Sequence, residues 1–256
     1  MNARLKIIRL ACLFLVCAGA VWLCWPALTM GRQLAQARMT TQKFTVEERV
    51  EQFAPVAVPR LKPCFDAAQI AWPPAQIALL GFKQEKRLEV HAAGADGRFR
   101  FIRSYPFTAT SGQLGPKLRE GDRQIPEGFY GIESLNPNSL YHLSLRVNYP
   151  NSFDRELGRE DGRKNLGGDI MIHGRSVTIG CIPVGDPAIE ELFVLAALTG
   201  IEKIQVIISP VDFRTGKLPA DMPVVPAWTE GLYAQIARAL AQFAPAENVL
   251  SSPAEK

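Results

Sequence analysis

At Ile77 the spacing of the apolar residues changes from a helical period to a strand-like one. In the second strand-like segment, Leu88 and Val90 alternate with polar neighbours, which is typical of a half-buried strand. Residues 93–97 (AGADG) have the composition of a hairpin loop. We therefore expect strands at residues 77–82, 87–91, 99–105, 128–133, 144–147, 170–173 and 203–209. On its alternating strand, His91 is expected to point outward into solvent.

The segment before these strands is expected to be helical. Thr45 and Glu48 have the spacing of a capping box, which predicts a short helix starting at Val46. Prolines are expected to interrupt the chain beyond this short helix, because a proline ring removes a helical hydrogen bond. These prolines are Pro55, Pro59, Pro63, Pro73 and Pro74. This part is predicted to be a helical prelude packed on the main domain.

Two more helices are expected towards the C-terminus. One lies after Cys181, with Asp186 as its N-cap and Gly200 just beyond its end. The other spans about residues 230–243, is capped by Thr229, and should dock its apolar face on the domain. The charge-rich residues 155–164 are expected to form an exposed loop.

Residues 10–30 are uncharged and mostly apolar. As a helix of about 1.5 Å per residue, they are long enough to cross a bilayer. Because the cations Arg4, Lys6 and Arg9 precede this run, the N-terminus is expected in the cytoplasm and the rest of the chain outside. Residues 35–37 (AQA) resemble a signal-peptidase site, so both a retained membrane anchor and a cleaved signal stay open.

Charge and ligand-type residues exclude several functions. The chain has 29 basic and 25 acidic residues, and three of the basic ones precede the apolar run, so the remainder is almost neutral. No nucleic-acid partner is expected for such a surface. The three histidines show no metal-ligand spacing, and Cys-x-x-Cys is absent. We expect neither a metal nor a cofactor.

Cys64 and Cys181 are the cysteines outside the apolar run. In an oxidising compartment they could pair as a structural disulfide, or one could be a free reactive thiol. Cys181 follows His173 by eight residues, and an imidazole close to a thiol can lower the thiol pKa and take its proton. Gly180 would let the backbone approach a substrate carbonyl, and the Cys181 amide could then donate to the developing oxyanion.

Residues 173–181 (HGRSVTIGC) resemble the His-Gly…Ser/Thr-x-Gly-Cys signature of the YkuD-type L,D-transpeptidases. Residues 111–117 (SGQLGPK), 121–130 (GDRQIPEGFY) and 141–150 (YHLSLRVNYP) are similar to the YafK branch of that family. The resemblance covers about residues 77–213. It implies a fold that is mainly β with α, having mixed sheets and flanking helices, and a periplasmic enzyme acting on peptidoglycan stem peptides.

The resemblance also implies roles for individual residues. Cys181 would be the nucleophile that attacks the L-centre of meso-diaminopimelate, His173 the general base and acid, and Gly180 the backbone on the oxyanion side. Substrate-binding or supporting positions would be Tyr141, His142, Gly174, Thr178 and Arg123. For His142 a supporting role is favoured over a catalytic one. The cations Lys117, Arg119 and Arg123 would form either a lid that meets the substrate or a solvated loop.

Two positions depart from the common family pattern. Ile179 and Pro183 stand where that pattern has His and often Arg. The acceptor therefore stays open between an amine, giving transfer, and water, giving an L,D-amidase or endopeptidase that acts on diaminopimelate linkages such as those to wall-bound lipoprotein. A non-catalytic wall-binding protein with paired Cys64 and Cys181 is the less favoured third class.

These features divide the chain into four parts. Residues 1–36 form the signal or anchor segment, which would associate with the inner membrane, and residues 37–76 form the helical prelude. Residues 77–213 form the catalytic domain, and residues 214–256 form a connector and an amphipathic helix.

Overall fold

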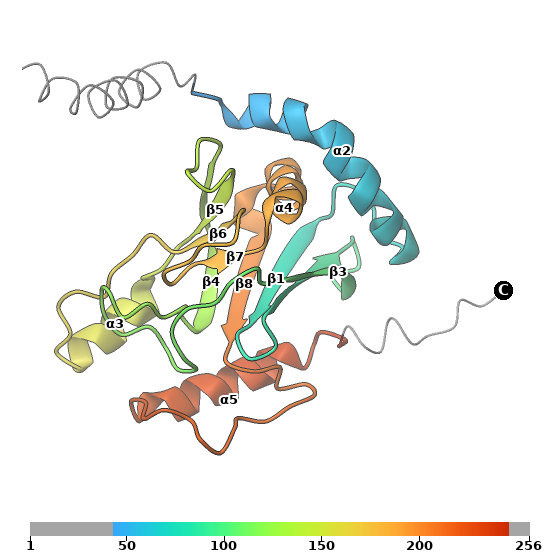
Figure 1. Ribbon diagram of the computed structural model, residues 1–256. Helices are drawn as coiled ribbons and strands as arrows, with labels where there is room; N and C mark the ends of the chain where they lie inside the picture. The colour runs from blue at the N-terminus through green and yellow to red at the C-terminus, as the bar shows by residue number, and fades with distance from the viewer. Residues whose placement is uncertain (1–42, 246–256) are drawn as a thin grey trace, which may run out of the picture. The chain divides into compact units, whose positions relative to one another are not determined.

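The computed structural model describes residues 43–245, and those from Phe44 on belong to one compact unit (Figure 1). The expected signal or anchor segment lies outside the described residues. Among the helices between residues 43 and 245, none combines the length and hydropathy of a membrane span.

The centre of this unit is an eight-stranded sheet in the order β3-β2-β1-β8-β4-β5-β6-β7 (Figure 1). Neighbouring strands are antiparallel except for the parallel pairs β1–β8 and β6–β7. The strands are β1 (Gln76–Phe82), β2 (Arg87–Ala93), β3 (Phe99–Pro106), β4 (Gly128–Asn136), β5 (Ser144–Val147), β6 (Met171–His173), β7 (Ile182–Pro183) and β8 (Ile204–Ser209). All seven expected strands are present, and the mainly β fold with flanking helices is confirmed.

Both faces of the sheet are covered, which β1 shows residue by residue. Its Leu79 belongs to the larger core, together with residues of helices α2 (Val46–Ala67) and α4 (Asp186–Thr199). Its Leu80 and Phe82 belong to a second core with α5 (Trp228–Leu240). Successive side chains of a strand point to opposite faces, so a strand between two helical layers is buried throughout.

Helix α2 starts as expected but is much longer. Thr45 Oγ1 accepts a hydrogen bond from the Glu48 amide, and the Glu48 carboxylate accepts one from the Thr45 amide, which completes the capping box. The expected interruption by prolines is wrong, because the helix runs for 22 residues with three of them inside. Spaced four apart, Pro55, Pro59 and Pro63 lie exposed on one side, where water can reach the carbonyls they leave unpaired. The other side buries Ala57, Leu61 and Phe65.

The start of α4 differs from expectation by one residue. Gly185 is the N-cap, and the carboxylate of Asp186 accepts a hydrogen bond from the Arg175 amide at 2.7 Å instead of capping the helix. The side chain is therefore used by the segment that leads to Cys181. The helix ends before Gly200 as expected, and a short 3-10 turn (Ile201–Lys203) leads into β8.

Helix α5 begins at Trp228, so Thr229 lies inside its first turn and does not cap it. The Thr229 amide already donates to the Pro226 carbonyl, which shows that the chain turns before the expected start. The apolar face docks on the sheet as expected. The residues that it buries with Phe243 are Leu232, Tyr233, Ile236 and Leu240.

The solvated position expected for His91 is wrong. Its side chain is fully buried, with Nε2 2.9 Å from the Glu89 carboxylate and the Phe243 ring packed edge-on against it. The chain around Phe243 covers the strand face that alternation alone assigns to solvent. Arg214 pairs with Glu89 inside the same cluster.

Residues 155–164 are not simply an exposed loop. Most of them belong to helix α3 (Ser152–Glu160), whose N-cap Asn151 forms a capping box with Asp154. The capping signal lies just before the charged run, and it overrides the mixed charges as a guide to local structure.

Candidate active site

A pocket of about 310 Å³ opens between the turn that joins β4 to β5 and the segment that joins β6 to β7. His173 ends β6 and Cys181 immediately precedes β7. Because β6 and β7 pair in parallel, with Ile172 beside Ile182, the connecting segment must return to the start of β6. This return brings Cys181 and His173 into the lining of one pocket.

His173 is buried, and its Nδ1 lies 2.6 Å from the Gly174 carbonyl oxygen. A carbonyl can only accept, so Nδ1 carries the proton and the neutral ring keeps its lone pair on Nε2. The Tyr141 ring lies against the imidazole, with centroids 4.5 Å apart. Burial lowers the pKa of His173, and the Gly174 carbonyl opposes this only in part. A neutral base is the result.

Cys181 is a free thiol that donates a hydrogen bond to the Asp169 carbonyl at 3.5 Å. Burial raises the pKa of the thiol, although the Met171 backbone acts in the opposite direction. This direction is opposite to the lowered thiol pKa expected from the sequence. A protonated thiol beside a neutral imidazole can still react, provided that the base removes the proton as the sulfur attacks. Cys64 is free as well, so the two cysteines do not form a disulfide.

The turn from Thr178 to Cys181 is held by side-chain hydroxyl groups. Thr178 Oγ1 accepts from the Cys181 amide at 2.9 Å and donates to the Cys181 carbonyl at 2.7 Å. Ser111 Oγ accepts from the Gly180 amide at 2.7 Å. The Cys181 amide expected to face an oxyanion is therefore engaged by Thr178, because this hydroxyl lies in the same tight turn.

Two glycines allow close packing here. Gly180 has φ +94°, and a Cβ added to it would lie 3.0 Å from the Gln124 carbonyl oxygen. A Cβ on Gly174 would lie 2.7 Å from the Tyr141 carbonyl oxygen. Side chains at either position would push the segment that contains Cys181 away from its neighbours.

Comparison with known proteins identifies relatives of this part of the chain. The family model of the YkuD L,D-transpeptidase catalytic domain matches residues 84–208. These residues match the YkuD family. This chain is 37% identical over 134 residues to the protein named "Putative L,D-transpeptidase YafK" from Escherichia coli K12, a match covering 50% of this chain and 52% of that protein. The chain thus spans about half the length of the curated relatives it matches.

Two solved structures are also similar to this chain. The helical cell shape determining protein Pgp2 from Campylobacter jejuni has 24% identity and a TM-score of 0.44, covering 69% of this chain and 60% of that one. L,D-transpeptidase 1 from Mycobacterium tuberculosis has 14% identity and a TM-score of 0.30, covering 52% of this chain and 62% of that one.

His142 does not line the pocket that contains Cys181 and His173. Its Nε2 is 2.9 Å from a Glu190 carboxylate oxygen on α4, and the Phe53 ring of α2 packs edge-on against its imidazole. This arrangement fits the supporting role favoured from the sequence. The side chain links the β4–β5 turn to the helical layer.

Of the three cations expected to form a lid, one is buried and two are exposed. Lys117 is buried and pairs with Asp122 at 2.6 Å, so its charge stabilises the loop itself. Arg119 and Arg123 are exposed, and the Arg123 backbone lies beside Gly180. Arg123 therefore borders the turn from Thr178 to Cys181 through its main chain.

Sequence reasoning assigned no role to Ser111 or Asp169. Ser111 belongs to a motif that was recognised, but its contact with Gly180 crosses 69 residues of sequence. Asp169 has a left-handed backbone with φ +54°, and its carboxylate pairs with Arg146. The only sequence signal for Asp169 is its position just before β6.

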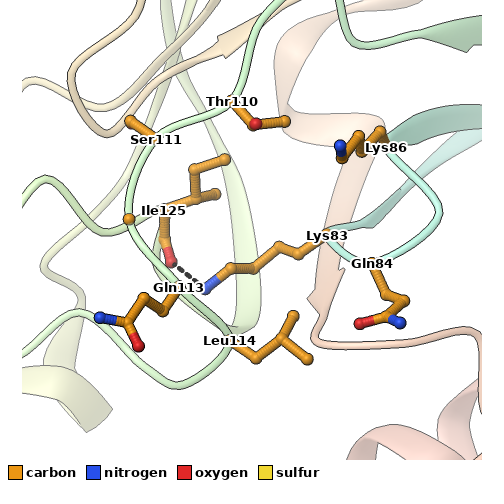
Figure 2. A pocket seen from close by; sticks show the side chains of 9 residues that line it. Lys83, Gln84, Lys86, Thr110, Ser111, Gln113, Leu114 and Ile125 are labelled. Carbon is orange, nitrogen blue, oxygen red and sulfur yellow. Dashed lines mark hydrogen bonds between the residues drawn. The ribbon is translucent and has the colours of Figure 1, made fainter. Parts of the chain in front are cut away.

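Ser111 lines a second pocket, of about 350 Å³ (Figure 2). In its wall, Lys83 Nζ donates to the carbonyls of Gly115 and Ile125 and pairs with Glu127 at 2.8 Å. Burial lowers the pKa of Lys83, while Glu127 opposes this. Lys83 thus secures the segment carrying Ser111. Within residues 43–245, no group of three His, Cys, Asp or Glu side chains is arranged to hold a metal.

Proposed function

We propose that this chain is a cysteine L,D-transpeptidase that acts on peptidoglycan stem peptides through an acyl-enzyme. The observation that carries the proposal is that Cys181 and His173 line one pocket, with the imidazole oriented by the Gly174 carbonyl. The substrate bond would join the L-centre of meso-diaminopimelate to the D-residue at the fourth position of the stem. The match to the YkuD family supports this substrate class.

In the first half-reaction, Cys181 Sγ attacks the carbonyl carbon while His173 Nε2 takes the thiol proton. The C–N bond then breaks, and His173 returns the proton to the leaving amine, which leaves a thioester on Cys181. In the second half-reaction, an acceptor amine forms a new C–N bond and the C–S bond breaks. His173 carries the amine proton to the departing sulfur.

Hydrolysis is the second candidate, in which the enzyme acts as an L,D-amidase or endopeptidase, including on diaminopimelate-linked lipoprotein. The observation that favours it concerns the two departures from the family pattern. Ile179 and Pro183 offer neither an imidazole nor a guanidinium next to Cys181 to orient a charged acceptor. Water loses less from the absence of such orientation than an amine does.

The test is incubation of the full chain with a defined stem tetrapeptide, followed by intact-protein mass spectrometry and product analysis. We expect an acyl adduct on Cys181 that is absent from Cys181→Ser and unchanged in Cys64→Ser. Excess D-amino acid should give exchanged tetrapeptide, whereas tripeptide alone would favour hydrolysis. If no adduct forms and no D-residue is released, the proposal is wrong.

We further propose that residues 10–30 hold the protein in the inner membrane with its body in the periplasm. The support is the uncharged run preceded by cations. Membrane fractionation with protease accessibility tests this topology. A mature N-terminus near Arg38 in the soluble periplasmic fraction would instead indicate a cleaved signal.

A further inference from the structure

The mouth of the catalytic pocket is formed by exposed apolar side chains, which we call the apolar rim. It consists of Leu140, Tyr141, Val177 and Ile179, which are 85%, 39%, 60% and 73% exposed. Single exposed apolar residues are ordinary on a protein surface. Four of them around one pocket form a patch of the kind that marks a binding site.

The apolar rim comes from two segments that meet at the reacting groups. Leu140 and Tyr141 belong to the β4–β5 turn, and the Tyr141 ring lies against the His173 imidazole. Val177 and Ile179 belong to the segment between β6 and β7 that ends in Cys181. The apolar surface therefore borders both the base and the nucleophile.

Charged partners are scarce in the same pocket. Asp169 is its one acidic lining residue, and its carboxylate is already paired with Arg146. No lysine or arginine lines this pocket within the described part of the chain. A charged side group bound there would lose hydration without gaining an ion pair.

The proposed reaction indicates which side of the scissile bond lies against the apolar rim. His173 gives its proton to the amine that leaves and takes a proton from the amine that enters, so both amines pass the same imidazole. By microscopic reversibility, a D-amino acid that attacks the thioester in the reverse of the first half-reaction occupies the subsite that the leaving D-residue vacated. Tyr141 borders this subsite because it covers one face of His173.

We propose that the apolar rim is a binding subsite for the side chain of the D-residue on the amine side of the bond, and that it selects apolar side chains. This inference rests on the proposed function and adds a specificity to it. Each methylene group buried there should raise kcat/KM about fourfold, from the usual transfer free energy of a methylene.

The experiment uses the full chain and two stem tetrapeptides that end in D-leucine or D-asparagine, whose side chains have similar shapes. Release of the fourth residue is measured as kcat/KM, which does not depend on whether the acyl-enzyme then meets water or an amine. We expect D-leucine to be released about tenfold faster than D-asparagine. Ile179→Ser and Val177→Ser should each reduce the D-leucine rate and leave the D-asparagine rate nearly unchanged.

Val224→Ser is the matched control, because Val224 is an exposed apolar residue that does not line this pocket. It should leave both rates as they are. Equal release of the two residues by the wild-type protein, with an adduct on Cys181, would overturn the subsite but not the proposed function. Failure to form an adduct or release either residue would overturn both. A preference for D-leucine over D-asparagine that persists unchanged in both Val177→Ser and Ile179→Ser would also refute the subsite.

Discussion

The side-chain oxygen of Ser111 accepts a hydrogen bond from the amide of Gly180, the residue just before Cys181, at 2.7 Å. A few residues earlier, the Thr108 amide donates to the Pro183 carbonyl at 2.9 Å, and its hydroxyl donates to the Arg175 carbonyl at 2.7 Å. The chain after β3 is thus joined to both sides of the turn from Thr178 to Cys181. The orientation of Cys181 depends on a segment remote in sequence.

Replacing Ser111 by alanine should lower kcat about fivefold and change KM little, because one hydrogen bond of about 1 kcal/mol that orients the turn is lost. Ser111→Thr keeps the hydroxyl and should restore most of kcat. Thr110→Ala is the control, since Thr110 is the neighbouring hydroxyl residue and also lines the second pocket. Steady-state kinetics and the alkylation rate of Cys181 check the prediction, and unchanged values in Ser111→Ala would contradict it.

The pKa shifts predict where activity falls with pH. Burial lowers the pKa of His173 below its usual 6.5, so the imidazole is neutral and able to accept a proton from pH 6.5 upward. Loss of kcat/KM on the acid side should therefore have its midpoint below pH 6.5. In His173→Gln, alkylation of Cys181 should rise only above about pH 9, since burial raises the thiol pKa from 9.0. A midpoint above pH 6.5 for the acid-side loss of kcat/KM would contradict a neutral His173 imidazole in the resting protein.

His173 and His142 should differ sharply in their effect on turnover. His173→Ala removes the base, and general base catalysis is typically worth about 10² to 10⁴ in rate. His142→Ala should keep most of the activity and lose about 1 kcal/mol of stability, because its ring contacts Glu190 and Phe53 outside the pocket. Single-turnover acylation and urea unfolding measure the two effects. Equal losses of turnover would move His142 into the catalytic group.

Arg214, Glu89 and Asp212 form a buried charge cluster, which should contribute strongly to the free energy of unfolding. Arg214→Met leaves the fully buried carboxylates of Glu89 and Asp212 without one of their cations, which should cost about 3–5 kcal/mol. The comparison is Arg100→Met, which breaks an exposed pair with Asp96 and should shift the denaturant midpoint far less. Denaturant midpoints for the two variants test the difference, and similar midpoints would contradict it.

Local patterns in the sequence were sufficient for the strands, the start of α2 and the expectation that Cys181 and His173 lie near each other. A strand is recognised from alternation over a few residues, and a capping box such as that of Thr45 and Glu48 from four. Cys181 and His173 lie only eight residues apart, so a short returning segment is enough to bring them into one pocket. These features depend on near neighbours, which the sequence lists directly.

Contacts between distant segments decided the rest. The helix through Pro55 survives because its prolines face water, and His91 is buried because the chain around Phe243 covers it. Three features of the site depend on which loops meet at the pocket. They are the contact of Ser111 with Gly180, the raised thiol pKa of Cys181 and the apolar rim. Burial is a property of the packed chain, because a side chain loses water only when another segment takes its place.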